Sequence, residues 1–73
     1  PTRHDYMNMG HIHWCRGDRQ AALHYYKQSI TFQGNSMEAF IESFNNDIEL
    51  LKKHNVDEAD IPIMLDQLRY HLE

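Results

Sequence analysis

Residues 4–34, HDYMNMGHIHWCRGDRQAALHYYKQSITFQG, decide the fold of this chain. In the middle of this stretch, Gly17 can adopt the left-handed conformation that ends a helix, and the carboxylate of Asp18 can cap the next one. On both sides of this turn, the apolar residues recur at helical spacing. We therefore predict one helix from Arg3 to Cys15 and a second helix from Arg19 to Gln33.

These two predicted helices each carry a face suited to packing against the other. Residues at positions i, i+3, i+4 and i+7 share one side of a helix. Because antiparallel helices cross closely only where side chains are small, Gly10 and Ala22 are predicted to form the point of close approach. The residues predicted to pack the pair together are Tyr6, Met9, Gly10, His13, Ala22, Tyr26 and Ser29.

Residues 36–54 carry an unbroken apolar stripe and are predicted to form one continuous third helix. Asn35 and Ser36 begin this helix, and if Asn35 is the N-cap, Glu38, three residues later, can complete a capping box. Asn55 is a suitable left-handed terminator, with Val56 folding back onto the helix. The stripe consists of Met37, Phe40, Ile41, Phe44, Ile48 and Leu51.

A fourth helix is predicted to begin near Asp60, because Pro62 is tolerated only in a first turn. Short connections favour antiparallel neighbours. The predicted fold class is all-α, with four antiparallel helices as two stacked helical hairpins in a single domain over residues 1–73. The apolar face of the fourth helix consists of Ile61, Met64, Leu65, Leu68 and Leu72.

Residues 4–34 resemble a tetratricopeptide repeat, whose pattern is W-x2-L-G-x2-Y, then A-x3-F, then a terminal proline over 34 residues. Residues 35–73 do not repeat the pattern, because Phe44 falls where its glycine should be. They are therefore expected to form a divergent or C-terminal capping pair in a right-handed solenoid fragment. The matching residues are Tyr6, Met9, Gly10 and His13 in the first helix, Ala22, Tyr26 and Ser29 in the second, and Gly34 at the place of the proline.

The resemblance implies a protein–protein interaction module, a terminal piece of a longer helical-repeat scaffold that binds another protein or a peptide. In this family, the first helix of each repeat lines a concave groove. Relatives that bind chaperone tails use Lys and Asn where this chain has Met7 and His11, so a chaperone tail is not the expected ligand. The implied groove residues are His4, Met7, His11, Trp14 and Cys15.

Two alternatives stay open. Tyr25 and Phe32 lie off the main stripe of the second helix, and this apolar flank could form a symmetric homodimer. The chain could also be an accessory domain of a larger enzyme or regulator. A first residue Pro1 and a final Leu72-Glu73, either native or a cloning scar, suggest a fragment.

The composition argues against several function classes. A net charge of −4 with scattered basic residues disfavours nucleic-acid binding. No apolar run approaches the ~20 residues that span a bilayer. A lone cysteine fits a reducing, cytoplasmic compartment, although a secreted helical domain needs no disulfide either.

Neither a metal site nor an enzyme active site is predicted. His11 and Cys15, at i and i+4, could supply two metal ligands, but a structural zinc site normally needs four. Cys15 also lacks a positioned third group that would make it a nucleophile. We expect no metal, no cofactor and no catalytic residues.

Overall fold

The computed structural model describes the backbone of residues 2–72, and the side chains of that range other than those of Gln33 and Leu72. The described residues form helices and no strand, which confirms the all-α prediction. Their elements are α1 (Arg3–Cys15), α2 (Arg19–Thr31), the 3-10 helix η1 (Phe32–Gly34), α3 (Met37–Asn45), α4 (Ile48–Lys53) and α5 (Asp60–Leu72).

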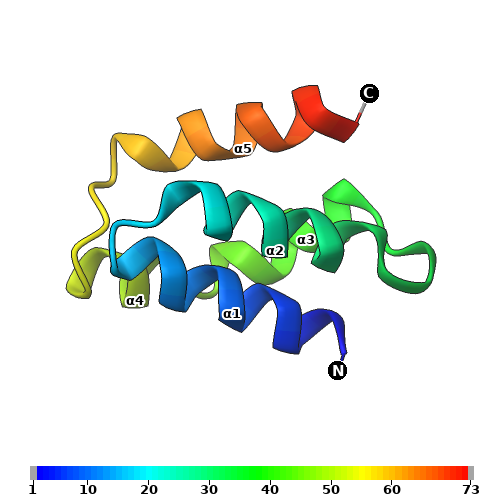
Figure 1. Cartoon of the computed structure of the whole chain (residues 1–73), viewed down its shortest axis with the longest axis horizontal. Coiled ribbons are helices and arrows are strands. Elements are labelled where there is room, and N and C mark those ends of the chain that lie inside the picture. Colours follow the sequence, from blue (N-terminus) through cyan, green and yellow to red (C-terminus); the bar gives the residue numbers. More distant parts are fainter. Residues whose placement is uncertain (1, 73) are drawn as a thin grey trace.

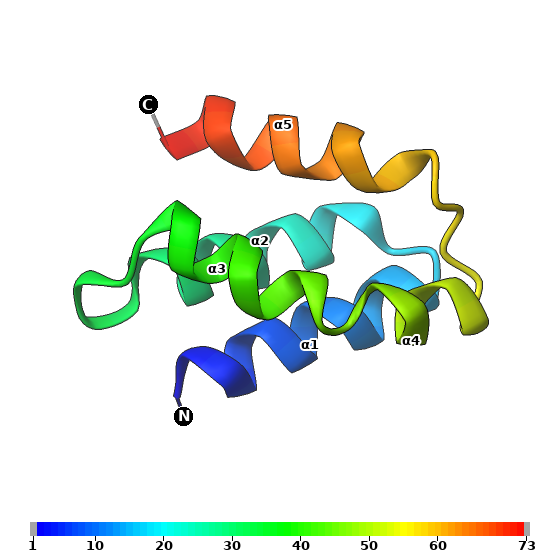
Figure 2. The same cartoon turned by 180° about the vertical axis from the view of Figure 1, so that it is seen from behind.

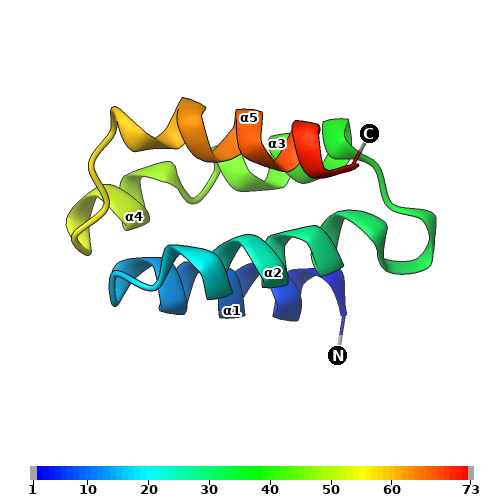
Figure 3. The same ribbon diagram turned by 45° about the horizontal axis from the view of Figure 1, so that its top comes forward.

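The helices lie in two layers, with α1 and α2 in one and α3, α4 and α5 in the other (Figure 3). Within the first layer, α1 and α2 run in opposite directions (Figure 1). Seen from behind, α3 lies across α2, and α4 lies near the C-terminal half of α1 (Figure 2). Since α2 contacts α1, α3 and α5, it is the central helix of the fold.

Local capping sets the ends of α1 and the start of α2. The Thr2 hydroxyl accepts from the Asp5 amide at 3.3 Å, and the Asp5 carboxylate accepts from the Thr2 amide at 2.8 Å. Gly17 is left-handed at φ 85°. The Asp18 carboxylate then accepts from the Ala21 amide at 3.1 Å and caps α2. These boundaries confirm the predicted turn.

The second helix ends earlier than predicted, at Thr31 instead of Gln33. The chain tightens into η1 and leaves it through Gly34, which has a left-handed φ of 76°. The next helix is capped by Ser36, whose hydroxyl accepts from the Ala39 amide at 3.1 Å. The predicted capping box of Asn35 and Glu38 is therefore wrong, because the cap lies one residue later.

The predicted continuous helix over residues 36–54 is also wrong, because it is broken between α3 and α4 at Asn46 and Asp47. The amide of Asp47 donates to the carbonyl of Phe44 at 2.9 Å, which is a tight turn in place of a helical bond. The Asp47 side chain does not cap α4, and its carboxylate instead lies 3.0 Å from Nε2 of His11 on α1. The apolar stripe survives the break, since Phe40, Phe44 and Leu51 are fully buried.

The last helix agrees with its prediction. Asn55 is left-handed at φ 78°, Val56 folds back so that its amide donates to the carbonyl of Leu51 at 3.1 Å, and α5 begins at Asp60. The side chain predicted at Leu72 lies outside the described residues. The buried face of α5 consists of Ile61, Met64 and Leu68, with Leu65 partly buried.

The buried face of α1 differs from the predicted one. Met9 is 38% exposed, while Tyr6 and His13 are only half-buried. The reason is that α1 is covered on two sides, by α2 and by the α3–α4 layer. Its buried residues are Met7, Gly10, His11 and Trp14.

The α1–α2 contact is closest at Gly10. A Cβ atom built on this glycine would overlap the ring of Tyr26, which is itself fully buried. The Ser29 hydroxyl donates to the carbonyl of Arg3 at 2.7 Å, and this bond joins the start of α1 to the last turn of α2. Ala22 is fully buried in the same interface.

Candidate functional site

Three polar side chains meet where the two layers touch. The Nδ1 atom of His11 lies 2.6 Å from the Tyr26 hydroxyl, and its Nε2 atom lies 3.0 Å from Oδ2 of Asp47. These residues come from α1, from α2 and from the turn between α3 and α4. We refer to Tyr26, His11 and Asp47 as the relay.

The burial of the relay fixes the direction of its hydrogen bonds. Burial raises the pKa of Tyr26, so the hydroxyl keeps its proton and donates to Nδ1 of His11. Burial also lowers the pKa of His11, against the opposing effect of the hydrogen bond to Asp47. A neutral imidazole then accepts from Tyr26 and donates from Nε2 to the Asp47 carboxylate.

The order carboxylate, imidazole, hydroxyl is the order used in nucleophilic catalysis. Here, however, the Tyr26 side chain is fully buried and surrounded by aromatic rings, so its oxygen offers no approach to a substrate. The surrounding ring centroids lie 6.1 Å away for Trp14, 5.5 Å for Phe40 and 5.6 Å for Phe44. The geometry gives the relay a structural role, since it joins both layers.

An apolar hollow of about 360 Å³ opens beside the relay, between α1 and α4. Ile12 and Leu50 stand at the hollow with 52% and 51% of their surface exposed. We call this feature the α1–α4 hollow. Its lining residues are His11, Ile12, Cys15, Arg16, Leu50, Leu51 and His54.

Cys15 is the only cysteine of the chain and is half-buried in this lining. Burial raises the pKa of its thiol, so the protonated form is favoured near neutral pH. In this form, it adds a small apolar surface to the lining of the hollow.

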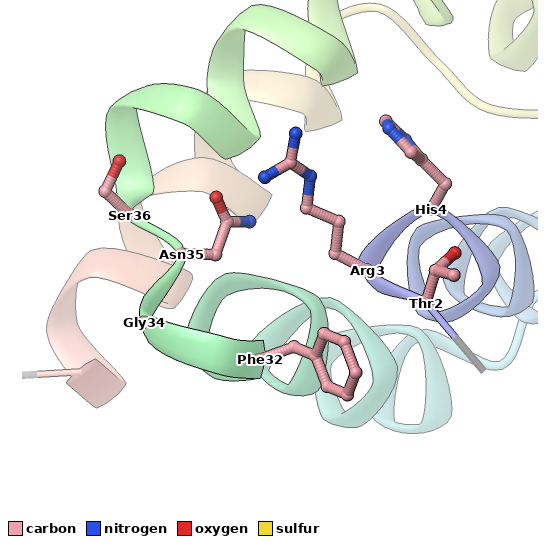
Figure 4. Close-up of a pocket in the computed structure, with 7 residues that line it drawn as sticks. All are labelled: Thr2, Arg3, His4, Phe32, Gly34, Asn35 and Ser36. Atoms are coloured by element: carbon pink, nitrogen blue, oxygen red, sulfur yellow. The ribbon is translucent and has the colours of Figure 1, made fainter.

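A second hollow, of about 410 Å³, lies where the start of α1 approaches the start of α3. Figure 4 shows the Arg3 side chain between His4 and Asn35, and Asn35 lies in the turn that leads into α3. The amide of Ala39 at this helix start is already satisfied by the Ser36 hydroxyl. The lining residues are Thr2, Arg3, His4, Phe32, Gly34, Asn35 and Ser36.

The five residues implied for a single concave groove do not lie together on one surface of the structure. Met7, His11 and Trp14 are at most 6% exposed, so their side chains contribute little open surface. Cys15 lines the α1–α4 hollow and His4 lines the second hollow. The expected groove is therefore filled by the chain itself.

Several residues of the site were missed by the sequence analysis. Asp47 is 36 positions from His11, and no local pattern pairs them. Leu50 was not singled out, because it lies outside the apolar stripe of residues 36–54. A large apolar side chain off the stripe was the signal that could have found it.

The predicted apolar flank is partly covered from within the chain. Tyr25 stacks on His13 with ring centroids 5.2 Å apart and an interplanar angle of 8°. Phe32 packs against Tyr6 at 5.6 Å. The large apolar side chains that are exposed are instead Met9, Ile12, Leu50, Ile63 and Tyr70.

Among residues 2–72, no group of three or more His, Cys, Asp or Glu side chains is arranged to hold a metal ion. Within the same range, no helix has the length and apolar character required to cross a membrane. No protein-family model, curated protein or solved structure gives a significant match to this chain.

Proposed function

We propose that this chain is a protein-interaction module that holds a large apolar side chain of a partner protein in the α1–α4 hollow. The observation that carries the proposal is the hollow itself, with two half-exposed aliphatic side chains beside it. Apolar side chains seated in such depressions supply most of the affinity of many interfaces. An open hollow of about 360 Å³ has room for a leucine, methionine or phenylalanine side chain.

The kind of module we propose is a helical-repeat fragment of the tetratricopeptide type. The close approach of Gly10 to Tyr26 supports this, because both residues stand at places where the family pattern has its glycine and aromatic residue. The two-layer order of the helices supports the finer description of two stacked helical hairpins (Figure 3). In this proposal, the partner meets the edge formed by α1 and α4, because the face of α1 beside it is already covered.

Cys15 provides a direct test of the proposal. A randomised peptide library is selected on the chain, and each enriched peptide is then tested for its ability to slow the reaction of the Cys15 thiol with a maleimide. We expect hollow-binding peptides to protect the thiol, since Cys15 lines the hollow.

A pair of variants localises the binding. The double variant Ile12→Ser/Leu50→Ser should lose the enriched peptides. The matched control Ile63→Ser/Tyr70→Ser, which removes exposed apolar surface from α5, should keep them. Circular dichroism checks that both variants fold. Peptides that bind the first variant as well as the parent chain would contradict the proposal.

Self-association is the second candidate, and the exposure of Met9, Ile12 and Leu50 favours it. In that case, the hollow receives a side chain from another copy of the chain. Light scattering over a wide range of protein concentration distinguishes self-association from the binding of another protein. A dimer abolished by Ile12→Ser/Leu50→Ser but retained in the control variant would identify the second copy as the occupant.

A further inference from the structure

The charges around the α1–α4 hollow identify the chemistry of the partner, an inference that rests on the proposed function. We propose that the partner segment carries a side-chain carboxylate next to the large apolar side chain that enters the hollow. Arg16 is the group that recognises this carboxylate, and His54 is a second donor beside it.

The lining of the hollow has a charge opposite to that of the chain. Although the net charge is −4, the one formally charged side chain in the lining is that of Arg16, and the lining contains no aspartate or glutamate. Such local basic character in an acidic protein gives electrostatic complementarity to a partner that is acidic at the same place.

The carboxylates near the lining residues in the sequence already have partners. Asp18 accepts from the Ala21 amide at 3.1 Å, and Asp57 accepts from the Ala59 amide at 3.0 Å. Asp47 accepts from His11 at 3.0 Å. Glu49 pairs with Lys52 at 3.6 Å, and Lys52 also pairs with Glu58 at 2.8 Å. In contrast, within residues 2–72, neither Arg16 nor His54 forms an ion pair with a carboxylate. The guanidinium group is therefore available for an external carboxylate.

An arginine suits this role for a geometric reason. Its planar group presents donors in a fork that matches a carboxylate with two parallel hydrogen bonds. Because Arg16 is exposed, the pair is expected to contribute selectivity more than affinity. The apolar side chain in the hollow holds the segment, and the carboxylate determines which segments are preferred.

The test selects peptides on the parent chain and on Arg16→Glu in parallel. The library is displayed without free carboxyl termini, so only side-chain carboxylates can contribute. On the parent chain, we expect Asp or Glu within two positions of a large apolar residue. On Arg16→Glu, we expect Lys or Arg at the same place. Arg16→Gln is the milder variant, and it should remove the acidic preference without replacing it.

A peptide selected on the parent chain then measures how much the carboxylate contributes to the binding affinity. Replacing its Glu by Gln, in an amidated synthetic peptide, should weaken binding about threefold, and raising the salt concentration should remove the difference.

Three outcomes would count against one or both proposals. Identical selected sequences on the parent chain and on Arg16→Glu would overturn the acidic partner while leaving the hollow as the binding site. An unchanged affinity of the Gln peptide would do the same. If no peptide depends on Ile12 and Leu50, the proposed function fails, and the acidic partner fails with it.

Discussion

The two layers of the molecule differ in how closely their helices follow local sequence signals. In the α1–α2 layer, the turn at Gly17 and Asp18 lies where its residues predict it, and each capping bond joins residues three apart. In the second layer, a continuous pattern is divided at Asp47, whose carboxylate bonds to His11 on α1. The comparison shows that a helix end can be set by a cap within one turn or by a side chain in the other layer.

Phe44→Ala should have the largest effect, because Phe44 joins the two layers. It is fully buried, and its ring lies 5.6 Å from those of His11 and Tyr26 and 6.3 Å from that of Trp14. Removing a buried phenylalanine costs about 3–5 kcal/mol. In a domain of this size, that loss leaves much of the chain unfolded. Urea unfolding followed by circular dichroism measures it.

The control for this prediction is Ile63→Ala on the exposed face of α5, which should change the free energy of unfolding by less than about 0.5 kcal/mol. If Phe44→Ala costs less than about 1 kcal/mol, the layers do not depend on this contact, and the packing between them is described wrongly.

Gly10→Ala tests the close contact inside the first layer. Alanine favours a helix over glycine by about 1 kcal/mol, but its Cβ would overlap the Tyr26 ring. Overpacking in a core costs about 1–3 kcal/mol, so we expect a net destabilisation of up to about 2 kcal/mol. Thermal unfolding measures the net change in stability. Asn8→Ala, at an exposed position of the same helix, is the control that shows the effect of helix propensity without the overlap with the Tyr26 ring. Stabilisation by Gly10→Ala would show that the ring has room to move.

Both of these residues could be assigned from the sequence, and the reason is that each belongs to a periodic pattern. The buried face of α2, the stripe containing Phe44 and the start of α5 all follow from spacing and turn residues. The helical class and most helix ends were predictable for the same reason.

The site was less predictable, because its contacts join residues far apart in sequence. The family resemblance placed His11 and Trp14 in an open groove, whereas the second layer of this chain buries both side chains. Asp47 lies 36 positions from its imidazole partner, a separation that no local sequence pattern spans. The α1–α4 hollow combines Cys15 with Leu50, and only the folded chain brings them together.

Variants at the start of α3 test how much a cap within one turn contributes to stability. The Ser36 hydroxyl caps this helix, so Ser36→Ala should cost about 1 kcal/mol, while Ser36→Gly should cost only a few tenths. Glu38→Ala should be close to neutral, because no capping box forms there. Chemical denaturation of the three variants measures the differences. If Glu38→Ala lowers the free energy of unfolding more than Ser36→Ala does, then Asn35 and not Ser36 caps α3.

The smallest expected effect is a pH dependence that tests the contact between the layers. Burial lowers the pKa of His11 in the folded chain, so the unfolded chain binds more protons just below its ordinary value. This contribution to stability is complete above about pH 6.5 and is lost as the pH falls toward the folded pKa. Between about pH 7.5 and pH 6, the loss cannot exceed about 0.8 kcal/mol, the free energy of protonating the unfolded imidazole.

Urea unfolding at the two pH values measures this loss, and variants isolate it from the other histidines. His11→Gln should be less sensitive to pH than the parent chain, whereas His71→Gln, at an exposed position on α5, should match the parent. The decisive result is whether the contribution of His11 to the free energy of unfolding falls or rises as the pH is lowered. If the parent chain gains stability from His11 as the pH falls, the ion pair with Asp47 outweighs burial, and the Tyr26 hydroxyl is not the donor to Nδ1.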